Sequence, residues 1–130
     1  MHIFTVWGEP TAAARPRLSK GRTYNPKAEQ QKAFQRKCRE ELAVLGWTEP
    51  SGNLFRVHLE LYLPVPQSMQ KRFKTPVYHK GRGDCDNYAK FVCDAMNGVL
   101  YTDDAQIVDM NIIKLCDLKP RTVIRFEELV

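Results

Sequence analysis

The strongest constraint on the fold is an alternation of apolar and polar residues from Leu54 to Leu63. Because successive side chains of a β-strand point to opposite faces, this pattern predicts a strand with one buried face and one polar face. His58 falls on the polar face, so we interpret it as a surface residue and not as a catalytic one. Pro64 and Pro66 cannot donate ladder hydrogen bonds and end the strand. The chain must therefore build a sheet and cover one of its faces.

Two helices are predicted to supply that cover. Asn25 followed by Pro26 is typical of a helix start, and Gly46 is typical of a helix end. Apolar residues recur between them at helical spacing. A second helix is predicted from about Asp86 to Met96. Its apolar stripe consists of Tyr88, Phe91, Val92, Ala95 and Met96.

Further strands are predicted at residues 2–7, 107–115 and 122–126, where apolar residues are dense or alternate. The order of elements is then β-α-β-α-β-β. This order favours a single α+β domain over residues 1–130, with a mixed sheet and its helices packed on one face.

Two connections interrupt this regular pattern. Residues 8–24 are rich in glycine, proline, small and basic residues, and Pro16 holds Arg15 extended, which predicts an exposed basic loop that becomes ordered on DNA. Residues 67–83 are basic and too long for an ordinary turn. We expect the large apolar side chains of this second connection to anchor in the core rather than to meet unstacked bases. They are Met69, Phe73 and Tyr78.

The composition gives no sign of a membrane or secreted protein. No apolar run approaches the roughly 20 residues of a membrane span, and the N-terminus lacks the apolar region of a signal peptide. We therefore expect a cytoplasmic protein. The cysteines lack the spacing of a zinc site and are interpreted as reduced, mostly buried thiols. They are Cys38, Cys85, Cys93 and Cys116.

Charge is distributed unevenly within a net charge of +5. Residues 10–39 have a net charge of +8, residues 65–83 have +5, and residues 84–130 have −4. Basic segments beside an acidic centre favour an enzyme that cuts a polyanion such as nucleic acid, although basic residues can also simply solvate a surface. The predicted DNA-binding residues are Arg15, Arg17, Lys20, Arg22, Lys71, Arg72, Lys74, Lys80 and Arg82.

The acidic centre holds five aspartates within 21 residues. If the second helix folds back on a strand, the pair Asp84 and Asp86 can converge with the pair Asp103 and Asp104. Carboxylates that close together repel, so either their pKa values rise or a cation lies among them. Hard oxygen ligands with open positions favour Mg²⁺ or Mn²⁺. Lys90 could then contact a phosphate or a reacting water.

A purely structural interpretation explains part of this pattern. Asp86 could be an N-cap of the second helix, with Lys90 as its salt-bridge partner one turn later. That interpretation leaves the other three aspartates of the two pairs unexplained. Asp94 is interpreted as structural, bonding in the turn that follows the helix.

Three motifs, in this order, resemble the RusA-type Holliday-junction resolvases. They are D-x-D-N-x-x-K at 84–90, D-A-x-N-G at 94–98 and D-D-x-Q-I at 103–107. The N-terminal segments Gly8-Glu-Pro, Arg15-Pro-Arg and Gly21-Arg-Thr-Tyr24 also resemble the opening of that family, so nearly the whole chain is covered. Two departures lie beside the carboxylates. Gly83 stands where the family often has proline, and Tyr88 stands where it usually has leucine.

The resemblance implies a homodimeric, Mg²⁺-dependent endonuclease, bacterial or phage-encoded, that resolves four-way DNA junctions by paired symmetric nicks in recombination and repair. It implies that Asp84, Asp86 and Asp104 bind the metal and that these residues and Lys90 are catalytic. Asp103 is a second-rank member of the metal-binding set. A junction presents two equivalent strands, which matches the two symmetric sites of a dimer.

Other functions remain open at this point. A nuclease of the same fold could act on forks, flaps or other branched DNA, and only a substrate panel would separate the two. A non-catalytic DNA-binding protein with an incidental acidic turn would show no Mg²⁺-dependent cleavage. A calcium-binding loop is the weakest alternative, because the spaced ligands and terminal glutamate of such a loop are missing.

Overall fold

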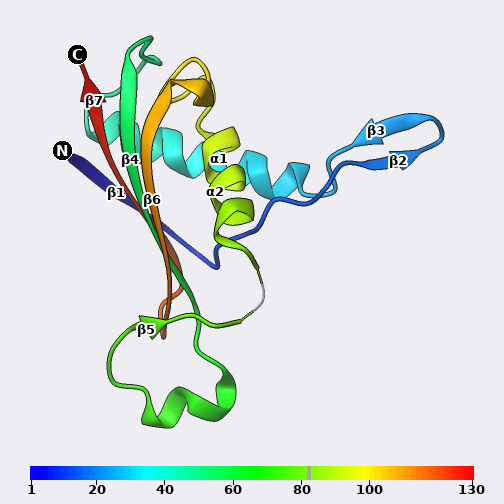
Figure 1. Cartoon of the computed structure of the whole chain (residues 1–130), viewed down its shortest axis with the longest axis vertical. Coiled ribbons are helices and arrows are strands. Elements are labelled where there is room, and N and C mark those ends of the chain that lie inside the picture. Colours follow the sequence, from blue (N-terminus) through cyan, green and yellow to red (C-terminus); the bar gives the residue numbers. More distant parts are fainter. Residues whose placement is uncertain (82) are drawn as a thin grey trace.

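A computed structural model describes residues 1–81 and 83–130. Among these residues, β1, β4, β5, β6 and β7 form one mixed sheet in the order β1-β7-β4-β6-β5, and β2 and β3 form a separate hairpin (Figure 1). The strands are β1 His2–Trp7, β2 Arg17–Ser19, β3 Arg22–Tyr24, β4 Leu54–Pro64, β5 Val77–Tyr78, β6 Ile107–Asp117 and β7 Arg121–Leu129. The helices are α1 Ala28–Val44 and α2 Cys85–Ala95, with 3₁₀ turns η1 at Gln67–Arg72 and η2 at Asp104–Gln106.

The predicted α+β fold with a mixed sheet is confirmed. β4 is the central strand, parallel to β6 on one side and antiparallel to β7 on the other. Its predicted alternation is also confirmed, since Phe55, Val57, Leu59, Leu61 and Leu63 are buried while Arg56 is exposed. The sheet places the buried residues of β4 in the middle of one continuous face.

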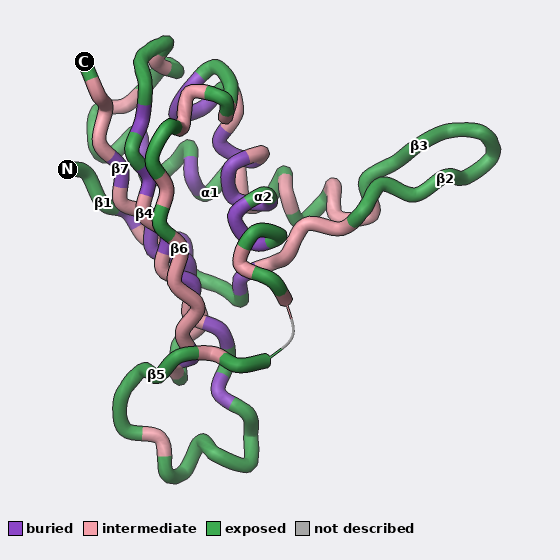
Figure 2. Tube along the Cα trace, in the orientation of Figure 1, coloured by how far each residue is buried: buried purple, intermediate pink, exposed green. Residues whose placement is uncertain are grey.

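Both helices cover that face, as expected. Cys38 and Leu42 of α1 and Val92 and Met96 of α2 pack in one core with the sheet, and Figure 2 shows burial concentrated where the helices meet the strands. The predicted stripe of α2 is buried, and its bounds lie within a residue of those expected. Neither helix is long and apolar enough to cross a membrane in the part of the chain that the structure describes.

The start of α1 differs slightly from the prediction. The helix begins at Ala28 and not at Pro26. Asn25 acts just ahead of it, because its Oδ1 accepts a hydrogen bond of 2.9 Å from the backbone N–H of Lys27. Gly46, with a φ of +83°, ends the helix as predicted.

The cysteine prediction is confirmed. All four cysteines are free thiols, and Cys38, Cys93 and Cys116 are buried while Cys85 is half-buried. Burial raises the pKa of both Cys38 and Cys93 to about 12. These thiols are therefore packing residues.

The prediction of an irregular loop over residues 8–24 is wrong in part. Residues 17–24 form the β2–β3 hairpin, which projects away from the sheet and helices in Figure 1. Lys20 and Gly21 make its turn with φ values of 51° and 74°. Positive φ at both central positions matches the right-handed twist of the strands, which explains why Gly follows Lys there. The prediction that this segment is exposed is confirmed for residues 15–24 and wrong for Pro10, which is buried, and for residues 11–14, which are half-buried.

The connection over residues 67–83 also contains short elements, η1 and β5. β5 adds an edge strand to β6 through Val77 and Tyr78. The prediction that the large side chains anchor in the core is wrong for Tyr78, which is 81% exposed, and for Met69, which is 50% exposed. Phe73 is half-buried. A two-residue strand at the sheet edge holds this connection without a core anchor.

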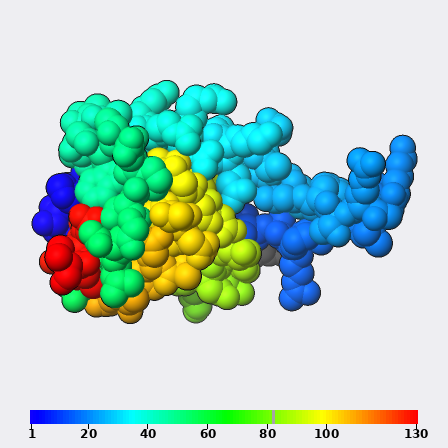
Figure 3. Space-filling model, turned by 90° about the horizontal axis from the view of Figure 1, so that it is seen from above, coloured from blue at the N-terminus to red at the C-terminus, as the bar shows by residue number. Residues whose placement is uncertain are grey.

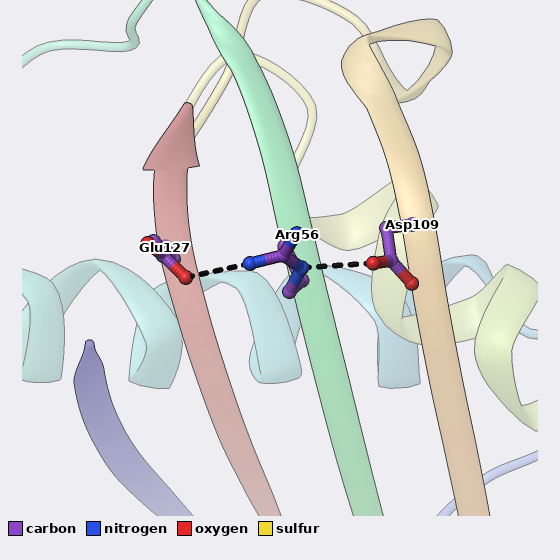
Figure 4. Close-up of polar contacts among 3 residues, drawn as sticks. All are labelled: Arg56, Asp109 and Glu127. Atoms are coloured by element: carbon purple, nitrogen blue, oxygen red, sulfur yellow. Dashed lines mark hydrogen bonds and ion pairs between the residues drawn. The ribbon is translucent and has the colours of Figure 1, made fainter. Parts of the chain in front are cut away.

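The sheet face opposite the helices carries charges of both signs. Arg56 on β4 donates to Asp109 on β6 at 2.8 Å and to Glu127 on β7 at 3.0 Å, so one guanidinium joins three strands (Figure 4). Further along, the Arg121 guanidinium lies 3.7 Å from the centre of the Tyr62 ring. This face therefore lacks the uniform positive charge that a DNA-binding surface needs.

Candidate active site

Helix α2 positions the predicted carboxylates. Asp84 is its N-cap residue in an extended conformation, and the backbone N–H groups of Asn87 and Tyr88 donate to the Asp84 carbonyl at 3.1 and 3.2 Å. The Asp84 carboxylate makes no capping bond within the described residues. Asp86 lies in the first turn, and both carboxylates are exposed. The N-cap interpretation of the Asp86 side chain is therefore wrong, and this pair is free to bind a ligand.

Basic segments adjoin this end of α2 on two sides. The backbone N–H of Ala13 donates to the Asn87 carbonyl at 2.9 Å, which holds the base of the β2–β3 hairpin against the first turn. On the other side the connection that carries Lys71 and Lys80 leads directly into α2 (Figure 1). Lys114 of β6 fixes its last residues by donating to the Gly83 carbonyl. Exposed basic residues therefore lie on segments attached to both sides of the Asp84–Asp86 pair.

Gly83 and Tyr88 shape the approach to α2. Gly83 has a φ of +99°, and a Cβ there would lie 2.5 Å from Cε2 of Tyr88. Tyr88 itself is buried against Leu61 and Leu63, and burial raises the pKa of its hydroxyl. Proline requires a φ near −65°, so it cannot replace Gly83 in this conformation. The two departures from the RusA pattern are thus physically coupled: the large ring and the positive φ occur together.

We expect Gly83→Ala to lower stability by about 1–3 kcal/mol, because alanine disfavours positive φ and its Cβ would clash with Tyr88. The thermal midpoint should fall by several degrees in a calorimetric or circular-dichroism melt. Gly52→Ala is the matched control, since Gly52 has no positive φ and open space around it. Equal midpoints for the two variants would contradict this account of Gly83.

A second group of charges lies at the other end of α2. Lys90 donates to Asp94 at 3.1 Å, and Asp94 lies within hydrogen-bonding reach of Asp104. Burial raises the pKa of Asp104 above its ordinary value, and the neighbouring carboxylates of Asp94 and Asp103 raise it further, while Lys90 lowers it. The carboxylate of Asp103 accepts from the backbone N–H of Ala105 at 3.0 Å and caps η2. Two carboxylates here face each other with too little positive charge between them.

The structure does not bring the two predicted pairs together within one chain. Asp86 and Asp94 are eight residues apart on α2, which separates them by about 12 Å along the axis. Asp104 joins the Asp94 end, and no group of three or more metal-ligating side chains occurs among residues 1–81 and 83–130. The ion pair between Asp86 and Lys90 that the purely structural interpretation required is not formed among the described residues, because Lys90 bonds Asp94 instead.

The carboxylates nevertheless suit a hard divalent cation. Mg²⁺ is often held by one or two carboxylates, with waters and substrate phosphates filling the other positions. The raised pKa of Asp104 fits such an ion, because a cation beside Asp94 and Asp104 would relieve the repulsion between these carboxylates, which adds to the effect of burial. Asp94 was predicted to be structural, and its position beside Asp104 was not predicted. Its position four residues after Lys90, on the same edge of α2, was the available signal.

The predicted DNA-binding residues are exposed wherever the structure describes them. One group lies on and next to the β2–β3 hairpin, and the other on and after η1. Arg82 lies outside the described residues. The exposed residues are Arg15, Arg17, Lys20, Arg22, Lys71, Arg72, Lys74 and Lys80.

Carboxylates on one helix, with basic segments attached at its end, are the side chains that an enzyme hydrolysing nucleic acid uses. The family model of Endodeoxyribonuclease RusA matches residues 8–127, and the chain belongs to the RusA family. The chain is also 30% identical, over 142 aligned residues, to a protein of Bacillus subtilis (strain 168) named "Uncharacterized protein YqaN". That alignment spans 97% of this chain and 95% of the relative. Family membership implies an endodeoxyribonuclease of the Holliday-junction-resolving kind, with branched DNA as its substrate.

Proposed function

We propose that this protein is a Mg²⁺-dependent endodeoxyribonuclease that resolves four-way DNA junctions by paired symmetric nicks, as a homodimer, in recombination and repair. One observation carries the proposal beyond family membership. Helix α2 presents two groups of carboxylates, and basic segments adjoin the end that holds Asp84 and Asp86. The basic segments supply phosphate contacts, and the carboxylates supply the ligands of a hard cation.

We assign Asp84, Asp86 and Asp104 as the residues that hold the metal, with Asp103 beside them. Mn²⁺ would suit the same oxygen donors as Mg²⁺. When bound, the cation polarises the scissile phosphoryl group and lowers the pKa of an attacking water. Asp94 joins this set because it contacts Asp104. Its negative charge also keeps Lys90 at the site before DNA binds.

Lys90 is assigned to stabilise negative charge on the phosphate as the bond breaks. Its ammonium lies 3.1 Å from Asp94, and the side chain remains largely exposed. A nearby phosphate can therefore share this ammonium without a large desolvation cost. A fixed cation beside the reacting phosphoryl group is a strong form of transition-state stabilisation.

A homodimer fits the substrate and the geometry of the chain. A four-way junction presents two equivalent strands, and two-fold symmetric sites match them. One chain keeps its two carboxylate groups at opposite ends of α2.

The decisive experiment incubates the protein with labelled four-way, forked, flapped and linear duplex DNA, with and without Mg²⁺. We expect paired symmetric nicks in the four-way DNA, and only when Mg²⁺ is present. Comparable cleavage of forks or flaps would favour a broader branched-DNA nuclease. Binding without cleavage in the presence of any divalent cation would show that the protein is a non-catalytic DNA-binding protein. Sedimentation of the same preparation measures its mass in solution, and we expect the mass of two chains.

A further inference from the structure

The β2–β3 hairpin and its base, residues 15–24, form an arm that has no other element to pack on. Every residue of this arm is exposed, and β2 and β3 form a sheet of their own. Figures 1 and 3 show the arm projecting well beyond the body of the molecule. An isolated two-stranded hairpin is only marginally stable in water. A partner that contacts the arm would therefore stabilise it.

The pairing of the two strands gives the arm two different faces. Arg17 pairs with Tyr24 and Ser19 pairs with Arg22, so these four side chains share one face. The opposite face carries Leu18 and Thr23, which pair with each other. One face therefore offers two guanidinium groups, a hydroxyl and an aromatic ring, while the other offers little beyond methyl groups.

The chemistry of the arm selects a polyanion as the partner. Its ten residues contain four Lys and Arg and no Asp or Glu. The sheet face opposite the helices carries charges of both signs, and so it complements the arm poorly. Arginine forks match phosphates and the O6 and N7 acceptors of guanine. Duplex DNA offers both kinds of acceptor.

The dimensions of the arm select one groove of that duplex. Five residues on each side give a length of about 16 Å, which exceeds the roughly 8.5 Å depth of the major groove. A two-stranded ribbon fits the undeformed major groove, about 12 Å wide, whereas it enters a minor groove of about 6 Å only when the DNA is deformed. The two-residue turn at Lys20 and Gly21 keeps the tip narrow.

We propose that this arm enters the major groove of a duplex segment next to the cleavage point and contacts base edges there. Arg17, Arg22 and Tyr24 face the bases, and Arg15 and Lys20 contact the flanking phosphates. Ala13, two residues before the arm, donates its backbone N–H to the Asn87 carbonyl in the first turn of α2, so the same DNA that fills the active site is within reach. This inference rests on the proposed function, because it takes branched DNA as the substrate.

Methylation protection tests the arm directly. Dimethyl sulfate modifies guanine N7, which lies in the major groove. In the absence of Mg²⁺, where no cleavage occurs, the parent protein should protect guanines in the arms of a four-way junction. The double variant Arg17→Ala, Arg22→Ala should lose that protection and bind about tenfold more weakly for each arginine removed. Netropsin, a minor-groove ligand, should not compete with the arm.

A matched variant separates groove contact from general charge loss. Lys32→Ala, Arg39→Ala removes two exposed cations from α1 instead. This variant should still protect the guanines. Its plot of log affinity against log salt should become shallower by about one for each phosphate that is no longer neutralised. Thr23→Ala changes the opposite face of the arm and should also keep the protection. Thermal midpoints of all variants should match the parent, because every changed side chain is exposed.

Three outcomes would overturn the inference. Protection that survives in the Arg17→Ala, Arg22→Ala variant would place other residues in the groove. Competition by netropsin would place the arm in the minor groove. A fall in sedimenting mass caused by the arm substitutions would show that the arm contacts a second copy of the chain. Cleavage in Mg²⁺ is measured in a separate assay. If the protein cleaves but guanine protection does not depend on the arm, the inference about the arm is wrong and the proposed function stands. If protection depends on the arm but no cleavage occurs, the proposed nuclease function is wrong and the inference about the arm stands.

Discussion

Asp86→Asn is expected to lower the rate of junction cleavage by orders of magnitude and to leave the fold intact. Asp86 lies exposed in the first turn of α2, and Lys90, its partner in the purely structural interpretation, bonds Asp94 instead. Asparagine keeps the size of the side chain and removes one charged ligand. Loss of a metal's charge stabilisation has effects of this magnitude on phosphoryl transfer. Single-turnover nicking of a labelled four-way junction measures it.

Binding and cleavage should separate in this variant. Without metal, the variant should bind the junction as tightly as the parent or more tightly, because one negative charge near the phosphates is gone. Asp84→Asn should have the same effects. The double variant should cleave only slightly more slowly than either single variant, because the effects of residues that act as a unit on the rate are not additive.

Glu29→Gln is the matched control for Asp86→Asn. Glu29 is also an exposed acid in the first turn of a helix, α1, so its substitution reproduces the loss of a favourable charge at a helix N-terminus. Both variants should lose well under 1 kcal/mol of stability for that reason. Only Asp86→Asn should lose cleavage. If it still cuts within a few-fold of the parent, Asp86 does not belong to the active site.

The parts of the fold that the sequence predicts well are those where burial repeats along the chain. β4 and α2 each carry apolar residues that repeat at regular spacing, so a single register buries all of those residues. The β2–β3 hairpin has no such signal, because its strands are three residues long and bury nothing. Its one local signal is Lys20-Gly21, a turn pair between Leu18-Ser19 and Arg22-Thr23-Tyr24.

The candidate site was predictable in its residue types but not in its grouping. The motif order places aspartates before, within and after α2, and the spacing alone cannot say which of them meet. Contact between Asp94 and Asp104 depends on how the turn after α2 returns the chain to β6. That return is set by buried residues such as Tyr101, whose hydroxyl donates to the Cys93 carbonyl at 2.8 Å. Such contacts between distant elements have no periodic signature in a sequence.

Asp104→Asn is expected to abolish cleavage and, unlike most substitutions, to raise the thermal midpoint by about 1–3 °C. Burial and the carboxylates of Asp94 and Asp103 raise the pKa of Asp104, so its ionised form costs free energy of folding. Asparagine removes that charge and can still bond Asp94. A melt of both proteins at neutral pH measures the difference.

The pH dependence of that stabilisation follows from the direction of the shift. At a pH above the raised pKa of Asp104 the carboxylate is ionised in both the folded and unfolded chains, and the folded chain bears the full cost. As the pH falls through the raised value, protonation relieves the folded chain first. The loss of folding free energy disappears below a pH of 3.8, the ordinary pKa of this carboxyl in the unfolded chain. The gap between the melts of Asp104→Asn and the parent should therefore be widest at neutral pH and close at acidic pH.

Mg²⁺ and a control variant distinguish a metal ligand from a merely strained carboxylate. If Asp104 holds the cation, millimolar Mg²⁺ should raise the midpoint of the parent, because a ligand that binds only the folded state stabilises it, and should leave Asp104→Asn unchanged. Asp109→Asn makes the same chemical change outside the site and removes a surface ion pair with Arg56. Its midpoint should stay level or fall slightly, and its response to Mg²⁺ should match the parent's. An Asp104→Asn variant that melts below the parent, or that keeps the Mg²⁺ shift, would remove Asp104 from the metal-binding set.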